Sequence, residues 1–128
     1  MDDTSRSARG MRVRREVLGD AHVDRAVANT TPVTADFQDF ITRYAWGEIW
    51  SREGLSRSER SMITLTALVV LRQDEELGMH LRAALRNGLT PEQISEVLLH
   101  TAVYAGVPAA NRAFAVATRV LAEEGQAG

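Results

Sequence analysis

Residues 57–72 read RSERSMITLTALVVLR, and this stretch decides the fold class. The four residues 56–59 (SRSE) have the form of a capping box, a signature of a helix N-terminus, and so do residues 90–93 (TPEQ). The centre of the stretch, residues 62–71, is apolar almost all round, which predicts a helix buried on most sides. In so short a chain, such a helix indicates an interface between subunits. We therefore expect a homo-oligomer.

The segments on both sides of this stretch also carry helical patterns. Phe37, Phe40, Ile41 and Tyr44 recur at a spacing of three to four residues, and no segment alternates as a strand does. The sequence thus predicts an all-α helical bundle, with a frayed segment over residues 1–10 and a single helical domain over residues 11–128. The expected helices span residues 11–29 with a break near Gly19, 34–52, 57–72, 75–86, 91–105 and 108–124.

Composition excludes several classes of function. The net charge of −2 provides no bulk attraction to nucleic acid or to an anionic membrane. No run approaches the roughly 20 apolar residues that span a bilayer, and the first residues lack an apolar signal segment. We expect a cytoplasmic protein that binds neither nucleic acid nor membranes.

Two residue types are missing from the chain. Without cysteine there is no thiol nucleophile, no disulfide chemistry and no Cys-ligated metal. Without lysine there is no side chain for a Schiff base, since all 15 basic residues are arginine. No His-x-x-x-His or Glu-x-x-His spacing occurs either, so we expect no metal site. The chemistry is left to His, Asp, Glu, Tyr, Ser, Thr and Arg.

Several segments, taken in order, resemble the carboxymuconolactone decarboxylase family, and the resemblance runs from about residue 12 to residue 121. They are residues 15–23 (REVLGDAHV), 44–50 (YAWGEIW), 60–65 (RSMITL), 80–88 (HLRAALRNG) and 96–111 (EVLLHTAVYAGVPAAN).

The same superfamily contains alkylhydroperoxide-reducing relatives with a Cys-x-x-Cys-x-x-x-His motif. If His80 is the histidine of that motif, its cysteine positions fall on Gln73 and Glu76. The resemblance therefore implies the decarboxylase branch and not thiol peroxidase activity. His100 stands where this branch is expected to have glutamine, so we give it little catalytic weight.

The resemblance implies a cofactor-independent carboxy-lyase that converts 4-carboxymuconolactone to 3-oxoadipate enol-lactone and CO2. This reaction belongs to the β-ketoadipate pathway of aromatic catabolism, and the family is expected to assemble as a hexamer. The substrate needs no cofactor because its conjugated lactone carbonyl accepts the electrons left by CO2. The protein must supply a hydrogen-bond donor for the lactone oxygen, a general acid and a cation for the carboxylate that is kept.

His80 is the first candidate for the acid, because its helical position lies at the boundary between core and solvent and the resemblance includes it. Arg60 and Arg82 are candidates for the carboxylate clamp, since a guanidinium offers a bidentate fork. The further candidates are Glu48 and His22 for proton transfer, and Trp46 and Tyr104 for substrate binding.

Two alternatives stay open. One is a related decarboxylase that acts on another lactone or keto acid. The other is a non-catalytic helical module for oligomerisation or small-molecule binding. For each candidate residue a structural role, such as packing or a solvated charge, competes with the functional one.

Overall fold

The computed structural model describes residues 2–126, and every regular element in that range is helical. The predicted all-α class is therefore confirmed for the described residues. Contacts divide the chain into two compact units, which we call the N-terminal unit (Met1–Leu55) and the C-terminal unit (Ser56–Gly128). The single domain over residues 11–128 stays a prediction.

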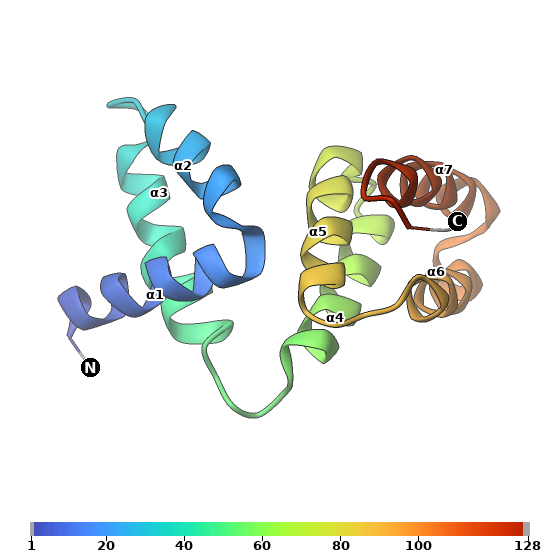
Figure 1. Ribbon diagram of the computed structural model, residues 1–128, viewed down its shortest axis with the longest axis horizontal. Helices are drawn as coiled ribbons and strands as arrows, with labels where there is room; N and C mark the ends of the chain where they lie inside the picture. Colours follow the sequence, from blue (N-terminus) through green and yellow to red (C-terminus); the bar gives the residue numbers. More distant parts are fainter. Residues whose placement is uncertain (1, 127–128) are drawn as a thin grey trace. The chain divides into compact units, whose positions relative to one another are not determined.

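The N-terminal unit consists of α1 (Asp3–Leu18), α2 (Asp20–Ala28), α3 (Ala35–Ile41) and the π-helix η1 (Thr42–Ile49). Helix α1 packs along η1, and α2 folds back after the predicted break at Gly19 (Figure 1). Gly19 has a φ of 90°, a conformation that a side chain disfavours. The buried apolar residues of this unit are Val13, Val17, Leu18, Val23 and Trp46.

Residues 3–10 are helical and not frayed as the sequence suggests, whereas Met1 lies outside the described residues. Asp2 caps α1 by accepting a hydrogen bond from the Ser5 amide at 2.7 Å. Arg6 then pairs with Glu48 of η1, and Gly10 is buried against the same element. The polar composition of residues 3–10 does not indicate these contacts, because the closest one is made by Gly10 and not by a large apolar side chain.

The helix expected to run from residue 34 to residue 52 changes type at Thr42 and continues as a π-helix. Its backbone lies very close to α1: a Cβ atom on Gly10 would fall 1.9 Å from the Thr42 carbonyl oxygen. A Cβ atom on Gly47 would fall 2.4 Å from the Arg6 carbonyl oxygen. The two glycines therefore allow a crossing of backbones that no other residue type fits.

The C-terminal unit consists of α4 (Arg57–Val70), α5 (Asp74–Arg86), α6 (Pro91–Ala105) and α7 (Val107–Glu123). Helices α4 and α5 lie side by side, α6 packs on α4, and α7 packs on α5 and α6 (Figure 1). Both predicted capping boxes are present, at Ser56 and at Thr90. The core is built chiefly from Leu65, Val69, Leu77, Leu81, Ile94, Leu98, Val116, Val120 and the small side chains of Ala84, Ala113 and Ala117.

Helix α4 is not buried on most sides within this unit. Ser61, Leu65 and Val69 face the core at intervals of four residues. On the opposite side Ile63 is 58% exposed and Val70 is 50% exposed. The chain alone thus leaves part of the apolar surface of α4 uncovered.

We predict that Gly10→Ala lowers the free energy of unfolding by about 2–3 kcal/mol, because the added Cβ forces α1 away from η1. Denaturant unfolding followed by circular dichroism measures the change. Gly54→Ala is the matched control, since nothing lies within 4 Å of the Cβ position there. A Gly10→Ala variant as stable as Gly54→Ala would contradict the close crossing.

Candidate functional site

His80 lies on α5 and is 8% exposed, more deeply buried than the boundary position expected from the helical pattern. It shares a face of α5 with Ala84, four residues later, and the C-cap residue Asn87 continues this face after three more residues. The Asn87 side-chain amide donates to the Ser61 hydroxyl of α4 at 2.8 Å. Because Ser61 is fully buried, this hydrogen bond holds the face of α5 that carries His80 against α4.

The two predicted clamp arginines lie in different surroundings. Arg82 donates to Glu123 and, at 3.1 Å, to Glu124 at the end of α7, so its fork is already engaged by two carboxylates. Arg60 is half-buried in the first turns of α4, one residue before Ser61. Of the two, Arg60 therefore lies on the helix that contacts the His80 face, whereas Arg82 is directed to α7.

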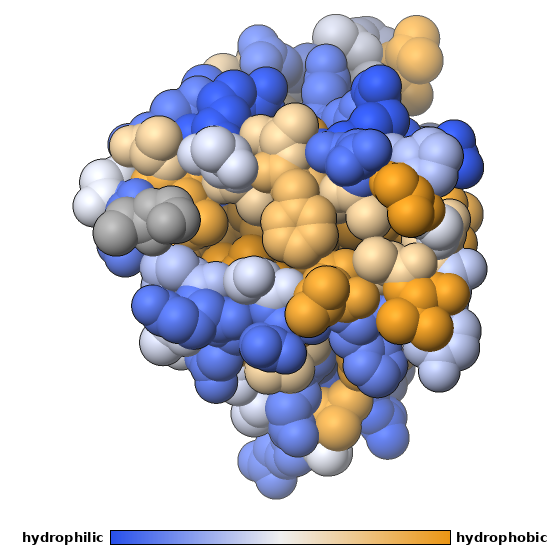
Figure 2. Space-filling view, turned by 90° about the vertical axis from the view of Figure 1, so that its right-hand side faces the viewer, coloured by the Kyte–Doolittle hydropathy of each residue, from blue (hydrophilic) through white to orange (hydrophobic). Residues whose placement is uncertain are grey.

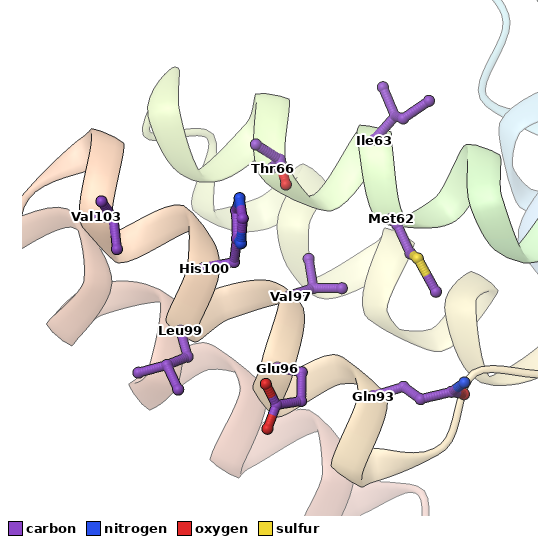
Figure 3. A pocket seen from close by; sticks show the side chains of 9 residues that line it. All are labelled: Met62, Ile63, Thr66, Gln93, Glu96, Val97, Leu99, His100 and Val103. Atoms are coloured by element: carbon purple, nitrogen blue, oxygen red, sulfur yellow. The ribbon is translucent and has the colours of Figure 1, made fainter.

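Tyr104 is 79% exposed near the end of α6, where its ring is tilted against the ring of His100 at 5.7 Å between centroids. His100 lines a groove of about 760 Å³ between α4 and α6. In Figure 3, Met62 and Thr66 from α4 and Val97 and His100 from α6 point toward one another across this groove. Its full lining is Met62, Ile63, Thr66, Gln93, Glu96, Val97, Leu99, His100 and Val103.

Glu48, Trp46 and His22 belong to the N-terminal unit. Glu48 lies on η1, where its carboxylate accepts a hydrogen bond from Arg6 Nε at 3.0 Å. Trp46 is buried and its ring stacks on Trp50 at 5.2 Å, as expected for residues four apart. His22 is half-buried on α2.

Glu48 also lines a hollow of about 300 Å³, together with Arg6, Phe40, Arg43 and Tyr44. Two arginines and two aromatic rings form its wall, and the Phe40 and Tyr44 rings stack at 5.6 Å. The Arg6 pKa is raised, chiefly by its hydrogen bond to Glu48. Both arginines already pair with carboxylates, Arg6 with Glu48 and Arg43 with Asp39, so the aromatic rings are the main surface that this hollow offers to a ligand.

The π-helix places these groups. π-Helical segments are rare and occur often at functional sites. The Gly47 carbonyl accepts hydrogen bonds from the Arg9 guanidinium at 3.1 Å and from the Ser51 hydroxyl at 2.7 Å. The irregular backbone is thus fixed by side chains from both sides, which holds the neighbouring Glu48 in place.

The structure brings the predicted residues together in two sets. In the C-terminal unit His80 and Arg60 lie on adjacent helices, and in the N-terminal unit Trp46 and Glu48 share one element. Their catalytic and binding roles stay predictions. Within residues 2–126 no group of three or more His, Asp or Glu side chains is placed to hold a metal ion.

Sequence reasoning missed Arg14, which is buried on α1 and donates to Gln38 and Thr42. Burial lowers the Arg14 pKa from its ordinary value. The helical spacing could have indicated that Arg14 is buried, because it lies four residues after Gly10 and four before Leu18, on the inward face of α1.

No helix within the described part of the chain is long and apolar enough to cross a membrane.

Comparison with known proteins gives a consistent result. The model of the carboxymuconolactone decarboxylase family matches residues 35–119. A 4-carboxymuconolactone decarboxylase of Acinetobacter baylyi is 46% identical over 125 residues, which cover 98% of this chain and 93% of that protein. A nitrosuccinic acid decarboxylase of Metarhizium robertsii is 42% identical over 112 residues, which cover 88% of this chain and 78% of that protein.

We predict that Asn87→Ala lowers the free energy of unfolding by about 1–3 kcal/mol, because it removes the partner of the buried Ser61 hydroxyl. The double variant with Ser61→Ala should lose less than the sum of the two single variants, as measured by denaturant unfolding. Strictly additive losses would show that the two side chains do not hold α5 on α4.

Proposed function

Because this chain belongs to the carboxymuconolactone decarboxylase family, we propose that it is a carboxy-lyase that converts 4-carboxymuconolactone to 3-oxoadipate enol-lactone and CO2. The observation that carries the proposal is the 46% identity with a 4-carboxymuconolactone decarboxylase over nearly the whole of both chains. The all-helical structure supports it.

The reaction suits a chain without lysine or cysteine. The bond between the ring carbon and the departing carboxylate breaks, and its electron pair moves through the conjugated double bond to the lactone carbonyl oxygen. A proton then adds to the α-carbon, which restores the carbonyl and gives the enol-lactone. The substrate itself holds the electrons, so the protein needs only to position it, stabilise the developing oxyanion and deliver a proton.

His80 is the proposed general acid. Imidazole titrates near neutral pH, and a largely buried position removes water that would compete for the proton. Glu48 and His22 are proposed to relay protons.

The substrate keeps one carboxylate, which needs a cation. Arg60 and Arg82 are the candidates that the sequence offers for this cation, and the structure shows Arg82 paired with Glu123 and Glu124. Trp46 and Tyr104 are proposed to supply apolar walls beside the departing carboxylate, since a less polar surrounding favours loss of its charge as CO2.

A second candidate function is decarboxylation of nitrosuccinic acid, favoured by the 42% identity with the Metarhizium enzyme. The two substrates carry the same kinds of group. Each has two carboxylates, and each has a group beside the departing carboxylate that can accept its electron pair. This group is a conjugated lactone in 4-carboxymuconolactone and a nitro group in nitrosuccinic acid. The same acid and clamp would serve both reactions.

The proposal includes assembly as a homo-oligomer, with a hexamer as the expected number, in the cytoplasm and in the β-ketoadipate pathway. Self-association is supported by the apolar surface that the single chain leaves uncovered. Apolar side chains gather on the side of α6 and α7 (Figure 2). Leu99, Val103 and Val107 of this region are 59%, 77% and 70% exposed.

We predict that the purified protein releases CO2 from 4-carboxymuconolactone and that His80→Gln lowers kcat by about 100-fold or more, because the general acid is lost. The fall in substrate ultraviolet absorbance and the released CO2 measure turnover. Arg86→Gln, an exposed change on the same helix, is the control for stability and should keep the wild-type rate. A folded His80→Gln variant with full activity would remove His80 from the mechanism.

If the wild-type protein turns over nitrosuccinate but not 4-carboxymuconolactone, the first function is wrong and the second stands. If it turns over neither substrate, the two alternatives are a related decarboxylase for another lactone or keto acid and a non-catalytic helical module.

We predict that the wild-type protein sediments as an oligomer and that Val103→Asp shifts it to smaller species, because a carboxylate is costly to bury in an apolar contact. Analytical ultracentrifugation at micromolar concentration checks this. Val33→Asp, which changes an exposed side chain of the N-terminal unit, is the matched control. A monomeric wild-type mass would contradict the proposed assembly.

A further inference from the structure

Arg14 is the one arginine within residues 2–126 that is buried, with 5% of its surface exposed. It lies on α1 among Gly10, Val13 and Val17, on the face that packs along η1. A guanidinium stays protonated even in such a place, so its full positive charge is carried into the interior. Burial of a charge is costly unless an opposite charge accompanies it.

The partners of Arg14 in the described chain are neutral. Nη2 donates to the side-chain oxygen of Gln38 at 3.0 Å, and Nη1 donates to the Thr42 hydroxyl at a long 3.3 Å. Nε is buried and has no hydrogen-bond acceptor among the described residues. Burial alone lowers the pKa of Arg14, with no carboxylate to oppose it.

Arginines at the surface of the same unit show the opposite arrangement. Arg6 pairs with Glu48, Arg15 pairs with Asp20 and Asp24, and Arg43 pairs with Asp39. These partly exposed pairs need less compensation than a buried charge, because water still solvates part of each guanidinium. Among residues 2–126, carboxylates thus accompany the partly exposed arginines of this unit but not the buried one, which is the reason to assign the anion for Arg14 to a ligand.

The geometry of the Arg14 guanidinium indicates which class of anion it can bind. The Nε and Nη2 N–H groups form one edge of the fork, which fits the two oxygens of a carboxylate. On this edge the single amide oxygen of Gln38 serves Nη2 and leaves Nε without an acceptor. Gln38 is only half-buried on α3, so its side chain has room to turn toward solvent. A carboxylate that replaces the amide oxygen bonds both N–H groups and supplies the missing charge.

We propose that Arg14, in place of the candidates Arg60 and Arg82, binds the carboxylate that the substrate keeps, through its Nε–Nη2 edge and with displacement of the Gln38 amide oxygen. This inference rests on the proposed decarboxylation of a dicarboxylate. The kept carboxylate is assigned, not the departing one, because a cation on the departing group would stabilise the substrate more than the transition state. The family model begins at residue 35 and does not include α1. The 46% identical 4-carboxymuconolactone decarboxylase aligns with 98% of the chain and does include it. A residue that recognises the particular substrate, and not a feature common to the family, is therefore expected in α1.

The test measures binding separately from turnover. The probe is propane-1,2,3-tricarboxylate, an unreactive carboxylate, with its neutral triamide as the ligand control. Isothermal titration calorimetry gives the affinity, and the thermal midpoint gives the stability with and without probe. The variants are Arg14→Met and Arg14→Lys. Arg12→Gln is the matched control, since Arg12 is exposed on the same helix, with Glu16 at 4.0 Å.

We expect the wild type and Arg12→Gln to bind the tricarboxylate but not the triamide. Arg14→Met should bind it at least about 10-fold more weakly, since charge-assisted hydrogen bonds are lost. In the absence of probe, Arg14→Met should be at least as stable as wild type, because an apolar side chain replaces an uncompensated buried charge. Arg14→Lys should bind with intermediate affinity, because it keeps the charge and loses the fork. With 4-carboxymuconolactone the variants should raise KM far more than they lower kcat.

Unchanged probe affinity in either variant would overturn the proposal, and Arg14→Lys decides the matter if Arg14→Met does not fold. If the variants weaken the oligomer but leave probe affinity and KM unchanged, the anion is a side chain of a second copy and the proposal is wrong. A wild-type protein that binds neither ligand overturns it as well. Arg14-dependent probe binding without turnover of 4-carboxymuconolactone would support the carboxylate site and refute the proposed reaction.

Discussion

The approach of the α1 backbone to the π-helix η1, made possible by Gly10 and Gly47, is the constraint on which the N-terminal unit depends. Because the helices touch through backbone atoms, the side chains beside the glycines reach across the contact. Arg14, one turn after Gly10, meets Thr42, and Glu48, next to Gly47, meets Arg6. The crossing therefore sets the positions of a buried cation and of a candidate proton carrier.

Helix α4 has a comparable role in the C-terminal unit. Its inner side contributes Leu65 and Val69 to the core, and Ser61 holds the end of α5. Its other side borders the groove toward α6, where the Thr66 and Thr101 hydroxyls share a hydrogen bond of 3.0 Å. One helix thus borders both the face of α5 that carries His80 and the apolar groove toward α6.

The sequence predicted the elements that rest on local rules. The capping boxes at Ser56 and Thr90 and the break at Gly19 follow from side-chain chemistry within a few residues, and all are present. The π-helix and the ordered start of α1 were missed, because both depend on a crossing between segments far apart in the sequence, in which Gly10 meets Thr42 and Gly47 meets Arg6.

The candidate site was predicted less completely. His80 and Glu48 were singled out by residue type and resemblance, and the structure gives them defined surroundings. Arg14 was passed over because fifteen arginines look alike until burial and partners distinguish them. The pairing of Arg82 with Glu123 and Glu124 could not be predicted either, since it joins residues more than 40 positions apart.

The stacked pair Trp46 and Trp50 has a spectroscopic consequence, because both tryptophans of the chain lie in the N-terminal unit. Intrinsic tryptophan emission therefore reports on that unit alone, while far-ultraviolet dichroism reports on the helices of both, and a difference between the two signals during denaturation would reveal whether the units unfold together.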